Sequence, residues 1–101
     1  MYINGIEDNK HGAIAAGINL TYCMETAIIE RNDEYILVVF VPATTPTKDV
    51  ARMRNLAWFE DEDEAFAAYG DMMKALTKDH KVWDIQVFKE KYAKREKIRK
   101  D

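Results

Sequence analysis

The chain has 101 residues, of which 48% are hydrophobic and 33% are charged, and its formal net charge is −3. This length predicts one domain with a modest core, and the apolar content argues against wholesale disorder. The longest apolar run, Ile36–Val41, is too short to cross a bilayer, and the single cysteine excludes an internal disulfide.

The clearest structural signal is a β-hairpin over residues 18–41, which follows expected turns in residues 3–12. The turn formers at 31–34 should close the hairpin, and Tyr35–Val41 is typical of a central strand because it is apolar on both faces. Pro42 should end this strand, since proline cannot donate to the ladder. Alternation predicts that one face of the first strand is buried, with Ile18, Leu20, Tyr22, Met24, Thr26 and Ile28 on it.

A helix over residues 61–78 is expected after a loop at 43–49 and a strand near 53–60, although part of the segment 50–59 also fits a helical face. Asp61 can cap this helix, and Glu64 lies three positions later, as in a capping box. Gly70, in the middle, suggests close packing against the sheet. The apolar stripe at helical spacing comprises Ala65, Phe66, Tyr69, Met72, Met73 and Leu76.

Residues 82–88 alternate as a strand would, although a helix starting there is the alternative. The predicted fold is therefore α+β, with a small antiparallel sheet, made of the hairpin and the strands near 53–60 and 82–88, packed on the helix 61–78. We expect one domain over residues 1–88 and a charged, basic C-terminal helix or tail over 89–101. Because one helix is narrow for such a sheet, we also expect a homodimer through the sheet or its exposed face.

Five consecutive acidic residues, Glu60–Glu64, have three interpretations. A helix start explains them alone, because negative side chains face the positive end of the helix dipole. A calcium loop needs a mid-loop glycine and a distal glutamate, which are missing, so no metal and no cofactor is expected. The third interpretation is a surface whose carboxylates replace phosphates in the basic groove of another protein. Its contact residues would be Glu60, Asp61, Glu62 and Asp63, joined by Trp58 and Trp83, whose simpler interpretation is as core.

The charge is unevenly distributed along the chain. Residues 1–79 contain seven Lys and Arg against fourteen Asp and Glu, whereas residues 80–101 contain eight against four. An acidic body repels nucleic acid, but the basic segment can contact phosphates. It is otherwise a solvated helix with pairs such as Glu90–Lys94. The residues that would bind nucleic acid are Lys89, Lys91, Lys94, Arg95, Lys97, Arg99 and Lys100.

Catalytic residues are scarce, so we do not expect an enzyme. The chain contains no serine, Cys23 lies in a predicted strand, and His11 and His80 are far apart in sequence. Gly12 and Gly17 have the spacing of a phosphate-binding loop, but the Lys and Ser or Thr that should follow are missing. The polar, acidic N-terminus does not resemble a secretory signal, so a cytoplasmic location is expected.

The leading functional hypothesis is a small non-catalytic protein-binding domain that regulates or inhibits a larger protein. Small acidic bacteriophage inhibitors of host nucleases or CRISPR effectors are similar in size and charge, and no motif adds to that analogy. The alternative is a nucleic-acid-binding accessory protein that uses the basic C-terminal segment.

Overall fold

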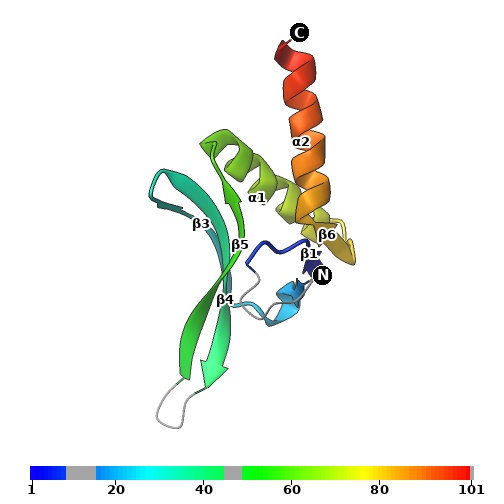
Figure 1. The fold of residues 1–101 in the computed structure, drawn as a ribbon. Helices are drawn as coiled ribbons and strands as arrows, with labels where there is room; N and C mark the ends of the chain where they lie inside the picture. Colours follow the sequence, from blue (N-terminus) through cyan, green and yellow to red (C-terminus); the bar gives the residue numbers. More distant parts are fainter. Residues whose placement is uncertain (9–15, 45–48, 101) are drawn as a thin grey trace.

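The computed structural model describes residues 1–8, 16–44 and 49–100, and the side chains of these except at 43–44, 49–50 and 97–100. These residues form an α+β fold of two three-stranded sheets and two long helices (Figure 1). No helix among them has both the length and the apolar character that crossing a membrane would require.

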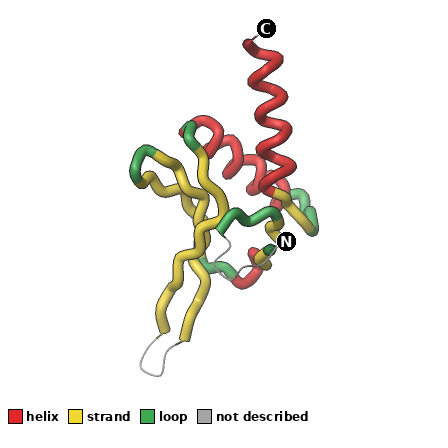
Figure 2. The backbone as a smooth tube through the Cα atoms, in the orientation of Figure 1, coloured by secondary structure: helices red, strands yellow, loops and turns green. Residues whose placement is uncertain are grey.

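The larger sheet is antiparallel, in the order β3-β4-β5 (Figure 2). Its strands are β3 (Glu25–Arg31), β4 (Glu34–Thr44) and β5 (Asp49–Phe59). Asn32 and Asp33 have φ angles of 54° and 63°, so a two-residue turn of the type favoured in hairpins joins β3 to β4. The predicted hairpin turn and central strand are thereby confirmed, as is the strand near 53–60.

The first hairpin strand is shorter than the alternation of residues 18–28 predicted. The chain forms β2 (Gly17–Asn19), then a single 3-10 turn, η1 (Leu20–Tyr22), and only then β3. The break has a local cause, because Asn19 Oδ1 accepts the N–H of Thr21 and so competes with a strand. As a result Tyr22 and Met24, which were predicted to be buried, are 72% and 65% exposed.

The smaller sheet joins distant parts of the chain in the order β2-β1-β6. Strand β1 (Tyr2–Asn4) lies where turns were expected, and it pairs antiparallel with β2 and parallel with β6 (Val82–Asp84). The strand predicted over 82–88 is therefore shorter and lies outside the antiparallel sheet. It ends because Asp84 Oδ1 accepts the N–H groups of Gln86 and Val87, which starts helix α2 (Ile85–Lys100).

Pro42 does not end β4, contrary to expectation, because the strand continues to Thr44. The carbonyl of Phe40 accepts the N–H of Met24, so it faces the β3 side of the sheet. Two positions later, Pro42 faces the same side, where β3 no longer flanks β4, since Glu25 is the first β3 residue and pairs with Phe40. The missing N–H of proline therefore removes no ladder bond.

Helix α1 (Glu62–Thr77) covers one face of the β3-β4-β5 sheet, close to its predicted range. Its buried stripe is narrower than predicted, because Phe66 is 58% exposed and small alanines replace it at the sheet surface. Gly70 is also exposed, and a Cβ atom there would meet nothing within 4 Å, so the expected close packing at Gly70 is wrong. The buried α1 residues are Ala65, Ala68, Met72 and Ala75.

Helix α2 begins within the core and leads away from it. Ile85 and Phe88 are buried against the small sheet and α1, whereas the C-terminal part of α2 extends beyond the rest of the molecule (Figure 1). The division into a domain of residues 1–88 and a basic segment of residues 89–101 stays a prediction. The helix itself starts four residues earlier, at Ile85.

Candidate protein-binding surface

Two acidic segments distant in sequence meet at one end of the β3-β4-β5 sheet. The first is the β3–β4 turn, and the second runs from the end of β5 into α1. They meet because Tyr35 at the start of β4 pairs with Phe59 at the end of β5. We call the exposed carboxylates of both segments the acidic end: Glu30, Asp33, Glu34, Glu60, Asp61, Glu62 and Asp63.

Carboxylates of both acidic segments influence the pKa of the Tyr35 hydroxyl. Burial is the largest cause that raises the pKa of its hydroxyl, followed by the negative charges of Glu30 and Glu62, a hydrogen bond with Glu62, and the charge of Asp33. Carboxylates from the turn and from the helix therefore act on the same atom. The sequence drew attention only to the run Glu60–Glu64. The acids of the turn belong to the same surface because of the strand register.

The negative field continues from the acidic end towards α2. Burial raises the pKa of the Tyr92 hydroxyl, and the charges of Glu96, Asp61 and Asp63 raise it further, as does that of Glu64. A hollow here is lined by Asp61, Asp63, Ala67, Tyr92, Arg95 and Glu96. Arg95, which the sequence assigned to nucleic-acid binding, thus lines a predominantly acidic hollow.

Part of the acidic run has the structural role that was predicted for it. Asp61 is the N-cap of α1, and its Oδ1 accepts the N–H of Asp63 at 3.1 Å. Glu62, Asp63 and Glu64 form the first turn, where the helix dipole stabilises negative charge. Across the described residues, no group of three His, Cys, Asp or Glu side chains is placed to hold a metal ion.

Trp58 is half-buried on the sheet face that points away from α1. A β-bulge at Leu56 places Leu56 and Ala57 both in the core, and Trp58 then lies beside Ile36 on the other face. Trp83, by contrast, is only 6% exposed, and its Nε1 donates to Asp71 Oδ2 at 2.9 Å. Trp83 is therefore a core residue, which was its simpler interpretation, and its contact with a partner stays a prediction.

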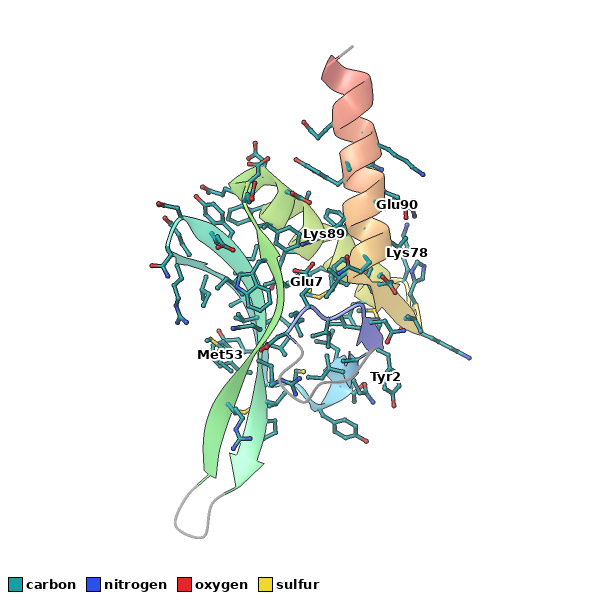
Figure 3. The ribbon with its side chains drawn as sticks, viewed as in Figure 1. Tyr2, Glu7, Met53, Lys78, Lys89 and Glu90 are labelled. Carbon is teal, nitrogen blue, oxygen red and sulfur yellow. The ribbon has the colours of Figure 1, made fainter. Side chains whose placement is uncertain are left out.

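Lys89 makes contacts within the molecule, and its assignment to nucleic-acid binding stays a prediction. Its Nζ lies 2.7 Å from Glu7 Oε2 and donates to the carbonyl oxygen of Trp58, also at 2.7 Å. It also lies 4.7 Å from the centre of the Phe59 ring, a cation–π distance. Through its contacts with Glu7 and Trp58, Lys89 connects α2 with the N-terminal segment and with β5 (Figure 3).

Three further basic residues of α2 have described side chains, namely Lys91, Lys94 and Arg95. Lys91 and Lys94 are exposed, and Lys94 lies 3.5 Å from Glu90, the pair that the helical spacing predicted. The side chains of Lys97, Arg99 and Lys100 lie outside the described residues.

A cleft between the end of α1, β6 and the start of α2 brings basic residues together that the sequence did not connect. Lys74, Lys78 and His80 line it together with Lys91 of α2. Its two carboxylates have structural partners: Asp71 accepts from Trp83, and Asp84 caps α2. The sequence signal that points to this cleft is the helical spacing of Lys74 and Lys78.

Cys23 is a poor nucleophile in this environment. It is half-buried, and its Sγ donates to the carbonyl oxygen of Asn19 at 3.8 Å. Burial raises the pKa of its thiol, and the nearby charge of Arg54 lowers it only in part. His80 lies in the basic cleft, while His11 falls outside the described residues.

Comparisons with protein-family models, with curated proteins and with solved structures found no match to this chain.

Proposed function

We propose that this chain is a non-catalytic protein-binding domain whose acidic end docks on a basic groove of a larger protein. The observation that carries the proposal is the convergence of carboxylates from the β3–β4 turn and the α1 start around Tyr35. A groove that binds nucleic acid is lined by Lys and Arg, and closely spaced carboxylates are their natural partners when phosphates are absent.

The rigidity of both segments supports this role. The β3–β4 turn is a two-residue hairpin turn, and Asp61–Asp63 are fixed by a helix cap. The backbone that presents the charges is therefore ordered before binding, which lowers the entropy cost of association. The field of a charged end also accelerates encounter with a partner of opposite charge, and this effect weakens with salt.

A domain that fills a basic groove excludes nucleic acid from it, which makes it a regulator or inhibitor of the protein that owns the groove. A nuclease or a CRISPR effector is one kind of protein with such a groove. What favours this class is the charge and small size of the chain together with the geometry of the acidic end.

The test compares three immobilised baits, namely the wild type, Glu62→Lys and Glu90→Lys. Glu62 belongs to the acidic end, and Glu90 is an exposed glutamate on α2, so both variants change the net charge equally. We expect a protein that the wild type and Glu90→Lys capture, that duplex DNA or RNA displaces, and that Glu62→Lys fails to retain. The proposal would be refuted if all three baits captured the same proteins. It would also be refuted if neither DNA nor RNA displaced the captured protein.

A second candidate function is nucleic-acid binding, which the basic cleft between α1 and α2 favours over the C-terminal segment alone. Binding should then weaken by orders of magnitude between about 50 and 200 mM salt. Substituting Lys74 and Lys91 by Glu should abolish it, whereas the same change at Lys94, outside the cleft, should have a smaller effect. A mobility-shift assay without any complex at low salt removes this candidate.

A further inference from the structure

The two edges of the β3-β4-β5 sheet are treated differently by the rest of the chain. The β5 edge is covered by Glu7, whose N–H donates to the carbonyl oxygen of Leu56 at 2.8 Å. Glu7 also accepts the N–H of Trp58 with its side-chain Oε1 at 2.9 Å. Strand β3 is the last strand on the other side, and no described strand pairs with its outer edge.

The strand register shows which β3 groups face outward. In a two-residue hairpin the residues flanking the turn form a hydrogen-bonded pair, here Arg31 with Glu34. Alternation then directs the N–H and C=O groups of residues 25, 27, 29 and 31 towards β4. Those of Thr26, Ile28 and Glu30 face away from β4, so they form the open edge.

This edge lacks the usual protection against pairing with another strand. Exposed edges are commonly blocked by proline, by a bulge or by a charge in the middle of the strand. Strand β3 has none of these in its centre, where Thr26, Ala27, Ile28 and Ile29 follow one another. Its charges lie only at its ends, with Glu25 at the start and Glu30 and Arg31 at the finish.

We propose that β3 pairs antiparallel with β3 of a second copy of this chain, about a two-fold axis at Ile28. In this register Glu25 of each copy lies opposite Arg31 of the other, and Thr26 lies opposite Glu30. The outward groups of Thr26, Ile28 and Glu30 then all find partners. A register shifted by two residues leaves Glu25 without an opposite charge, so the end charges of β3 select this register.

The position of α1 gives an independent reason for a second copy beside β3. The hydroxyl groups of Tyr69 on α1 and Thr26 on β3 are 3.1 Å apart, so this flank of the helix leans towards the open edge. Phe66, three residues earlier, shares that flank and is 58% exposed. In the dimer the two β4 strands would lie about 14 Å apart, three strand spacings, and the aromatic side chains of both α1 helices would fill the space above the joined edges.

The charged pair provides the sharpest test, in the full chain by equilibrium sedimentation over a concentration series. The wild type should form dimers, and either Arg31→Glu or Glu25→Arg alone should weaken dimerisation about tenfold or more, since like charges then face each other twice. The double variant, Glu25→Arg with Arg31→Glu, should restore it. A wild type that stays monomeric, single variants as strong as the wild type, or a double variant without recovery would each overturn the proposal.

A second pair of variants separates backbone pairing from side-chain effects. Glu30→Pro removes an outward N–H while leaving the β3–β4 ladder intact, so it should give a monomer with an unchanged circular dichroism spectrum. Glu30→Ala keeps that N–H and should remain dimeric. If both variants dimerise equally, β3 is not the interface. If Glu30→Pro fails to fold, the charge-swap variants still decide the question.

Discussion

Lys89 of α2 and Glu7 of the N-terminal segment form an ion pair with Nζ and Oε2 2.7 Å apart. Both side chains are about three-quarters shielded from solvent, at 26% and 25% exposure. The pair is part of a network, because Gln86 Nε2 donates to Glu7 Oε2 and to the carbonyl oxygen of Gly5. It fixes the segment that covers the β5 edge against α2.

Replacing Lys89 should therefore destabilise the fold rather than only change its charge. In Lys89→Ala the Glu7 carboxylate and the Trp58 carbonyl lose a charged donor in a partly buried place, which should cost about 2 kcal/mol of unfolding free energy. Lys94→Ala is the matched control, since its exposed pair with Glu90 is worth only a few tenths of a kcal/mol. Urea unfolding of both variants measures the difference, and equal stabilities would contradict this role of Lys89.

The same pair predicts a specific response to acid. Burial alone would raise the pKa of Glu7, but the hydrogen bonds from Lys89, Trp58 and Gln86, with the charge of Lys89, outweigh it and lower this pKa. The stabilisation is therefore present above the ordinary glutamate pKa, about 4.3, and is lost as the pH falls through the lower pKa of the folded state.

Glu7→Gln should accordingly flatten the acid limb of the curve of unfolding free energy against pH. It should also lower stability at neutral pH, where the wild-type carboxylate is charged and paired. Chemical denaturation at a series of pH values provides both results, and an acid limb as steep as that of the wild type would show that other carboxylates cause it.

The two glycines Gly70 and Gly17 should respond to alanine in opposite directions. At Gly70 the new Cβ meets nothing within 4 Å in the middle of a helix, so Gly70→Ala should stabilise the fold by about 0.5–1 kcal/mol. At Gly17 the Cβ would lie 2.6 Å from Asn4 Oδ1 and 3.2 Å from the Ile3 carbonyl oxygen, so Gly17→Ala should destabilise it. Thermal melting distinguishes these outcomes, and a Gly70→Ala variant with a lower Tm would contradict the packing of α1.

Two neighbouring carboxylates of the acidic end, Asp61 and Glu60, should differ in how much they contribute to the stability of the fold. Asp61→Ala removes the N-cap of α1 and should cost about 1 kcal/mol. Glu60→Ala removes an exposed side chain one residue outside the cap and should leave stability nearly unchanged. Both variants lose one negative charge. A partner that recognises only the charge of this surface should therefore bind both variants with a similarly reduced affinity. Equal stabilities in urea would show that Asp61 does not act as a cap.

Elements whose signals are local could be predicted from the sequence. The β-branched run around Val38 and Val39 requires burial on both faces, and Asp61 followed by three acids marks a helix start. The hairpin turn at Asn32 and Asp33 is equally local, because both residues tolerate positive φ.

Features that depend on distant partners could not be predicted. Tyr2–Asn4 is too short to reveal a strand, and its pairing with β6 depends on residues at the other end of the chain. Ala68 and Ala75 of α1 were missed because hydrophobicity favours Phe66, whereas close approach to the sheet favours small side chains. The acidic turn joins the candidate site only through the register of Tyr35 with Phe59.

The parallel pairing of Tyr2 with Val82 has a consequence for the order in which the parts of the fold form. Strand β1 sits in the centre of the small sheet, yet one of its two neighbours is synthesised about 80 positions later. The pairing of β1 with β6 must therefore wait until residues about 80 positions later are present, and closing so long a loop is a slow step. Completion of the small sheet should accordingly be a late step in folding.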